Sequence, residues 1–73
     1  MSRTTRDQLI AQLQYAIGRE RYSQFRYREA AKLALNDGLR RLLESLVNEE
    51  AGHEKKLRRA LEKLKGAATE GQA

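Results

Sequence analysis

Cysteine and proline are both missing from this chain of 73 residues, and each absence narrows what the chain can be. Without cysteine it forms neither a disulfide nor a thiolate metal site. Without proline, long helices can run uninterrupted. No apolar run approaches the ~20 residues that a membrane span needs, and no apolar export signal follows Met1 to Arg6. We therefore expect a cytoplasmic protein with no membrane segment.

The short chain has few other sources of stability. It holds one domain at most, and a core of this size rarely supplies more than about 3–5 kcal/mol. With disulfides excluded, a bound metal or a partner chain is the remaining support. Charged residues make up 34% of the chain, which suits helices with solvated outer faces. The net charge of +5 favours anionic partners, although the arginines are spread along the chain rather than gathered in one block.

Apolar residues recur at spacings of three and four in two long segments, which is typical of helices with one buried face. Thr5 followed by Gln8 matches a capping box, so the first helix is predicted over about 5–35. The residues of its stripe are Leu9, Leu13, Ala16, Ile17, Glu20, Tyr27, Ala31 and Ala34. Those of the second stripe are Leu39, Leu42, Leu43, Leu46, Glu50, His53, Leu57, Ala60, Leu61 and Leu64.

Asn-Asp-Gly at 36–38 predicts a turn between the stripes. The second helix is expected over about 39–65, with Gly66 as its C-cap and 67–73 as a flexible tail. The fold class is therefore all-α, an antiparallel helical hairpin over 4–66. Two helices cannot bury stripes of this width, so we expect two hairpins to pair into a four-helix bundle.

Three residues with metal-ligand chemistry interrupt the stripes. In the sequence, Asp37 lies almost midway between Glu20 and His53, and Glu50 lies one helical turn closer to it than His53 does. In an antiparallel hairpin these offsets place all three side chains within about one helical turn, roughly 5 Å, of the same height. Charged groups in a core stripe are costly to bury unless they are paired or bind a metal. The spacing therefore predicts that they converge in the bundle interior.

A single chain supplies two carboxylates and one imidazole, and a two-fold dimer doubles this set. Four carboxylates and two imidazoles, with Glu-x-x-His on two of the helices, are the ligands of di-iron and di-manganese carboxylate bundles. Oxygen ligands combined with imidazole suit iron or manganese, with zinc as a substitute. The sequence thus predicts a metal site made of Glu20, Glu50 and His53 from both copies of a homodimer, or of a larger assembly of dimers.

Other readings of these side chains stay open at this point. Glu20 and Glu50 can instead pair with arginines such as Arg21 or Arg58 at the stripe edge, which leaves His53 as a half-buried helix residue. Tyr27 lies two turns from Glu20 on the same stripe, either as core packing or as a hydrogen-bond donor near the site. The flanking acids Glu49 and Glu54 are expected to be solvated, with Glu54 and Arg58 forming a surface ion pair.

The segment from Glu20 to His53 resembles the ferritin-like superfamily, and in particular one half of a rubrerythrin domain. The resemblance rests on Glu20 and Tyr27, on Gly38, and on the run Leu-Val-Asn-Glu-Glu-Ala-Gly-His at 46–53. The interval between Glu20 and Glu50 is also similar to that of encapsulated ferritins, which build an iron site across a dimer of short chains. The resemblance implies two irons per dimer, with Glu50 as a bridging ligand, and oxidation of Fe(II) by oxygen or peroxide.

The chain departs from these families in four respects. It lacks a second half-motif, so one copy cannot complete the site. No docking peptide for a protein compartment is recognised in the tail. Arg19 and Arg21 flank Glu20 where encapsulated ferritins carry acidic residues. The cysteine pairs of the rubredoxin-like electron route are absent.

Two other functions compete with a ferroxidase. A basic helical hairpin that dimerises resembles the Rop type of RNA-binding protein, with phosphate contacts as its source of affinity. Nucleic acid is the less favoured partner, because this function leaves the interior Glu20, Glu50 and His53 unexplained. Alternatively, a metal at these residues serves only to hold the dimer together.

Overall fold

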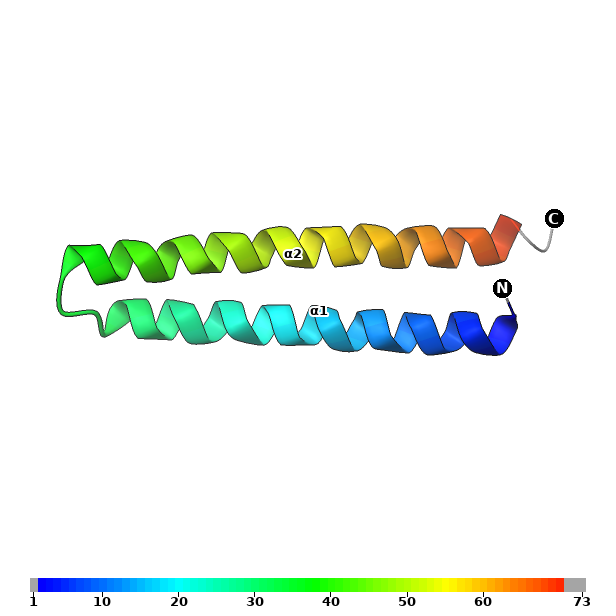
Figure 1. Cartoon of the computed structure of the whole chain (residues 1–73), viewed down its shortest axis with the longest axis horizontal. Coiled ribbons are helices and arrows are strands. Elements are labelled where there is room, and N and C mark those ends of the chain that lie inside the picture. Colours follow the sequence, from blue (N-terminus) through cyan, green and yellow to red (C-terminus); the bar gives the residue numbers. More distant parts are fainter. Residues whose placement is uncertain (1, 71–73) are drawn as a thin grey trace.

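The chain folds as two long antiparallel helices lying side by side. The computed structural model describes residues 2–70, with side chains described for 2–66. Helix α1 spans Arg3–Lys32 and helix α2 spans Asp37–Glu70, joined by a short connection at one end of the rod (Figure 1). The rod measures 56 × 15 × 12 Å. The predicted helical hairpin is thus confirmed, while its pairing into a bundle remains a prediction.

Helix α1 begins earlier than the predicted capping box. Ser2 is the N-cap, with extended backbone angles, and its hydroxyl accepts a hydrogen bond from the Thr5 backbone N–H at 3.1 Å. The prediction that the helix starts with Thr5 as its cap was wrong, because a serine earlier in the chain satisfies an orphan donor of the first turn. Thr5 instead lies inside that turn, where its hydroxyl accepts a hydrogen bond from that of Ser2.

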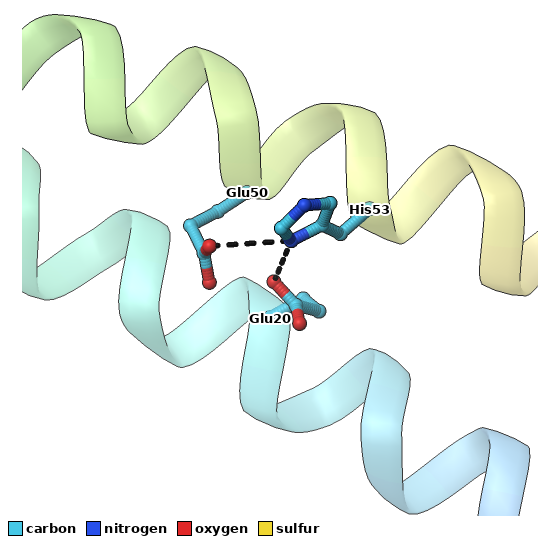
Figure 2. Close-up of side chains that lie close together, drawn as sticks. All are labelled: Glu20, Glu50 and His53. Carbon is cyan, nitrogen blue, oxygen red and sulfur yellow. Dashed lines mark ion pairs between the residues drawn. The ribbon is translucent and has the colours of Figure 1, made fainter.

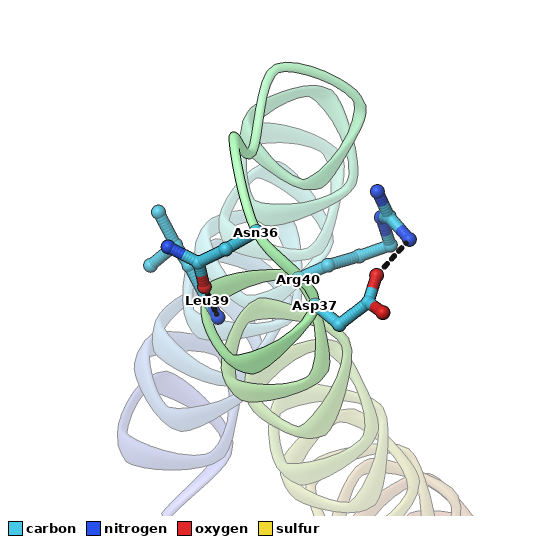
Figure 3. A network of polar contacts seen from close by, with 4 residues as sticks. All are labelled: Asn36, Asp37, Leu39 and Arg40. Atoms are coloured by element: carbon cyan, nitrogen blue, oxygen red, sulfur yellow. Dashed lines mark hydrogen bonds and ion pairs between the residues drawn. The ribbon is translucent and has the colours of Figure 1, made fainter.

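The connection between the helices lies before the predicted turn rather than within it. Helix α1 ends at Lys32 and not near 35. Asn36 caps α2, since its side-chain oxygen accepts a hydrogen bond from the Leu39 N–H at 2.8 Å (Figure 3). Asp37 lies in the first turn of α2, which suits the positive end of the helix dipole, and pairs with Arg40 at 2.8 Å. The predicted turn at 36–38 is therefore the start of the second helix.

Gly66 does not end the second helix. Helix α2 continues to Glu70, and no glycine in the described part of the chain has a positive φ of the kind that a glycine C-cap adopts. The residues after Gly66 begin with two alanines, the strongest helix formers, which favour continuation through the glycine. Of the predicted flexible tail, 67–70 are helical and 71–73 lie outside the described residues.

The hairpin encloses very little core of its own. Among the described side chains only Ile17 and Gln24 are buried, at 6% and 7% exposure. Leu9, Leu39 and Leu42 belong to the predicted apolar stripes but remain 40% to 55% exposed. Because these leucines belong to the stripes that carry Glu20 on α1 and Glu50 and His53 on α2, we call them the open apolar face of the rod. Among residues 2–70, neither helix contains a stretch long and apolar enough to cross a membrane.

Candidate metal centre

The structure brings the three predicted ligand residues together near the middle of the rod. Glu20 extends from α1, and Glu50 and His53 extend from successive turns of α2 toward it (Figure 2). One potential ligand atom from each residue lies within 4.8 Å of the other two. The convergence predicted by counting residues outward from Asp37 is therefore confirmed, and the metal itself remains a prediction.

The distances within this cluster suit a shared ion better than hydrogen bonds. His53 Nδ1 lies 3.3 Å from a Glu50 oxygen and 3.5 Å from Glu20 Oε2. Most N–H···O hydrogen bonds are about 2.7–3.2 Å long. Two ligand atoms that each lie about 2.1 Å from one ion at a tetrahedral angle are about 3.4 Å apart. The imidazole nitrogen thus already has the spacing of a neighbouring ligand to each of the two carboxylates.

One oxygen of the cluster has an ion-pair partner, His53 Nδ1 at 3.5 Å, but accepts no hydrogen bond. This oxygen, Glu20 Oε2, is buried. Leaving a buried acceptor unsatisfied costs about 1–3 kcal/mol, and more when the group is charged. A cation bound between Glu20 and His53 would satisfy this oxygen. The donor set and this buried acceptor together fit a metal ion.

The competing explanation by arginine pairing does not match the observed contacts. Arg58 pairs with Glu54 at 2.7 Å, one turn along its own helix. In the part of the chain with described side chains, His53 is the only ion-pair partner of Glu20 and of Glu50. The two carboxylates therefore face each other and an imidazole, and no guanidinium pairs with them, although Arg19 lines the same hollow.

The electrostatic cost of this arrangement falls on Glu50. The adjacent Glu20 carboxyl group, which favours a shared proton, raises the pKa of Glu50 above its ordinary value, and partial burial acts in the same direction. The nearby His53 opposes this rise without cancelling it. A carboxylate crowded by another carboxylate gains more from a cation than an isolated one does, which is the expected condition of a metal ligand.

A polar bridge beside the cluster was not predicted from the sequence. The buried Gln24 donates a hydrogen bond to Glu54 across the two helices at 2.8 Å, and Glu54 also pairs with Arg58. The expected Glu54–Arg58 pair is confirmed, but the expectation that Glu54 is solvated was wrong, since its side chain is only 19% exposed. The available signal was the position of Gln24, one helical turn after Glu20 on the inner side of α1. The bridge fixes the two helices against each other next to His53.

Replacing Glu54 by glutamine should lower the free energy of unfolding by roughly 1 kcal/mol at neutral pH, because a charged hydrogen-bond acceptor becomes a neutral amide. Hydrogen bonds from Arg58 and then Gln24 hold the pKa of Glu54 below its ordinary value of 4.5. The stabilisation is therefore present above that value and is lost as the pH falls through the folded-state pKa. Urea unfolding at neutral and acidic pH, at one protein concentration, measures the difference.

The matched control for this substitution is Glu62→Gln, which removes an exposed acid of the same helix. Among the described residues no ion pair involves Glu62, so its replacement should change stability little at either pH. A destabilisation by Glu54→Gln that persisted unchanged into acid would contradict the role given to the charge.

Tyr27 lies apart from the three ligand residues. It is partly buried and lines a hollow with Ala30 and Leu43, on the side of the cluster nearer the connection. No hydrogen bond among the described residues joins it to Glu20, Glu50 or His53. Its partial burial fits core packing, and a hydrogen-bonding role near a metal stays a prediction.

The cluster is incomplete in one chain and open on one side. Three donor groups fall short of the four to six ligands that transition metals usually take. The His53 side chain is 54% exposed even though it belongs to the predicted inner stripe. A hollow lined by Ala16, Arg19, Ser23 and both glutamates opens beside it. The small alanine and serine side chains leave room for another helix to approach the cluster closely.

Comparisons of the chain with protein-family models, with curated proteins and with solved structures find no match. Membership of the ferritin-like superfamily is therefore not supported by these comparisons, and the resemblance rests on the sequence motif alone.

Proposed function

We propose that two copies of this hairpin pair through the open apolar face and hold a di-iron carboxylate centre between them, which oxidises Fe(II) with oxygen or peroxide. The observation that carries the proposal is the convergence of Glu20, Glu50 and His53, in which a buried Glu20 oxygen accepts no hydrogen bond. Two copies supply four carboxylates and two imidazoles, enough for two ions.

Two features of the hairpin support the presence of a second copy, because one partner would explain both. The apolar stripe residues Leu9, Leu39 and Leu42 are exposed, and the ligand residue His53 is exposed with them. A hairpin with so little enclosed core is not expected to be stable by itself, whereas apolar burial stabilises association by about 25 cal/mol per Å². One partner seated on this face would bury the leucines and complete the ligand set together.

The chain's own side chains have separate tasks in this proposal. Glu20 and Glu50 bind the cations through oxygen and lower the positive charge of the site, and His53 provides a nitrogen ligand from α2. Bound iron supplies the redox chemistry, with Fe(II) as the substrate and oxygen or peroxide as the oxidant. The Gln24–Glu54 bridge holds α1 and α2 so that the ligands from the two helices stay in reach of each other.

Native mass spectrometry after anaerobic addition of Fe(II), followed by oxygen-consumption measurements, tests the proposal. We expect a dimer, or a multiple of dimers, with two irons per pair of chains and consumption of oxygen as Fe(II) is added. His53→Gln should lose the iron, and Glu49→Gln, an exposed acid beside the site, should keep it.

Two other outcomes would overturn the proposal at different points. If the dimer binds two metal ions but consumes no oxygen, the metal only holds the chains together. That outcome overturns the ferroxidase assignment. A chain that ignores Fe(II), manganese and zinc alike overturns the metal site, and the cluster is then an ordinary group of polar residues.

A further inference from the structure

Exposed aromatic and arginine side chains share the outer side of α1. Tyr15, Tyr22 and Phe25 are 66%, 62% and 55% exposed. Large rings are usually buried for most of their surface, and this hairpin has little core, so their exposure is unexpected. We define the outer strip as Tyr15, Arg19, Arg21, Tyr22, Phe25, Arg26 and Arg28. All seven side chains are exposed. The strip is about 20 Å long at the rise of an α-helix.

The strip is built from a repeat of seven residues. Tyr-Ala-Ile-Gly-Arg-Glu-Arg at 15–21 is followed by Tyr-Ser-Gln-Phe-Arg-Tyr-Arg at 22–28. Seven residues are almost two helical turns, so each tyrosine and each arginine recurs on the same face about 10 Å further along. The result is a row of rings with a row of guanidinium groups on either side.

The rings and the arginines are arranged against one another. The guanidinium carbon of Arg19 lies 6.0 Å from the ring centre of Tyr15, and that of Arg26 lies 5.9 Å from Tyr22. Tyr22 and Phe25 are stacked with their centroids 6.5 Å apart. A Cβ atom added to Gly18 would meet nothing within 4 Å, and the hollow that this glycine lines lies between the rings of Tyr15 and Tyr22. The strip therefore offers flat rings with open space beside them.

Most of the positive charge of the strip is not neutralised by ion pairs on the hairpin. Between positions 15 and 28 the chain has four arginines. The one acidic residue of this segment, Glu20, points toward Glu50 and His53 instead. None of the ion pairs among residues 2–66 involves these four arginines. Glu54 of α2 lines a hollow with Arg21 and Arg28 and balances part of this charge. The positive charge that remains favours an anionic partner.

The outer strip is also separate from the open apolar face. Tyr15 and Tyr22 each precede a buried residue, Ile17 and Gln24, by two positions. At about 100° per residue, two positions correspond to about 200° around the helix, so the rings point away from α2. Glu20 likewise lies two positions from Tyr22, so pairing of two hairpins around Glu20, Glu50 and His53 leaves the rings accessible. Arg19 of the strip also lines the hollow beside Glu20.

We propose that the outer strip binds single-stranded nucleic acid, with bases stacked on the tyrosine and phenylalanine rings and phosphates held by the flanking arginines. Unpaired bases stack on any exposed ring, and stacking is worth about 1–3 kcal/mol per base. Arginine neutralises phosphate and also stacks on bases. A duplex keeps its bases stacked internally and cannot use the rings, so the single-stranded form is the preferred ligand.

Fluorescence anisotropy with a labelled oligouridylate of about 16 nucleotides tests this proposal on the full chain in metal-free buffer. Tyr22→Leu should weaken binding by about 5- to 150-fold, the loss of one stacked base, with little change in salt dependence. Arg19→Gln combined with Arg26→Gln should lower the slope of log affinity against log salt by about 1.4, the value for two phosphate contacts. A self-paired RNA hairpin of equal length should bind more weakly.

The matched control is Arg41→Gln combined with Arg59→Gln, which removes the same charge from exposed positions of α2. Equal losses from the two double variants, or an unchanged affinity of Tyr22→Leu, would show diffuse attraction to a basic protein and overturn the proposal. Absence of binding at low salt would overturn it too. If Tyr22→Leu instead breaks a larger assembly into dimers without RNA, the strip is a contact between proteins and the proposal fails.

Discussion

Glu50→Gln should weaken Fe(II) binding by more than about 100-fold and at the same time make the metal-free protein more stable. Loss of a residue that only orients a ligand costs about 10- to 100-fold in metal affinity, and loss of a ligand should cost more. In a dimer the substitution removes two of the four carboxylates. Anaerobic Fe(II) titration gives the affinity, and thermal unfolding of the metal-free form gives the stability.

The gain in stability follows from the crowding of two carboxylates. Since the Glu20 carboxyl group raises the pKa of Glu50, ionised Glu50 is disfavoured in the folded state relative to the unfolded one. This penalty is present above the folded-state pKa and is relieved as the pH falls through it. The neutral amide introduced by the substitution avoids the penalty at neutral pH, so the melting temperature should rise there and the difference from the native chain should narrow in acid.

Glu49→Gln is the matched control, because it removes an exposed acid one residue away that faces solvent. It should leave both iron affinity and melting temperature nearly unchanged. A Glu50→Gln protein that is less stable than the native chain without metal would mean that Glu50 serves the fold. A residue that destabilises the fold and is required for a ligand is a functional one.

Leu42→Asp should dissociate the protein into monomers and remove most of its helical structure. Leu42 is 55% exposed in the single hairpin, so the substitution would be mild if the hairpin existed alone. At a dimer interface the substitution places one carboxylate from each copy in an apolar contact. The free energy of association should become less favourable by several kcal/mol. Light scattering after gel filtration measures the mass, and circular dichroism measures the helix content.

Leu35→Asp provides the comparison for this substitution. Leu35 is 97% exposed in the connection between the helices, and the same chemical change there should leave mass and helix content intact. The native chain should also melt at a higher temperature as its concentration increases, since association and folding are coupled. A Leu42→Asp chain that stays helical and binds iron at the native stoichiometry would contradict pairing through the open apolar face.

The hairpin could be predicted because its two apolar stripes are long and regular. The ends of the helices could not be predicted, because the residues found there favour more than one local structure. Asn-Asp-Gly at 36–38 suits a turn, yet asparagine is also a favoured N-cap and aspartate a favoured first-turn residue. Gly66 suits a C-cap, yet the alanines after it favour continuation of the helix.

Part of the candidate site could likewise be predicted from the sequence, and part could not. Glu20, Glu50 and His53 could be brought together by counting, because an antiparallel hairpin fixes heights along its axis. The bridge from Gln24 to Glu54 could not, since it depends on how each helix is rotated about its own axis and on the reach of two long side chains. The outer strip depends on the same rotation, which decides whether Tyr15 and Tyr22 face α2 or solvent.

The placement of the cluster along the rod affects the order in which the protein opens. Glu20 lies in the middle part of α1, several turns from both Arg3 and Lys32. Glu50 and His53 lie in the middle part of α2, several turns from both Asp37 and Glu70. Helices fray from their termini, so those turns must unwind before a ligand residue is released. Backbone amides around the cluster should therefore be the slowest to exchange their hydrogens with solvent, and the ligands should remain aligned while the ends of the rod fluctuate.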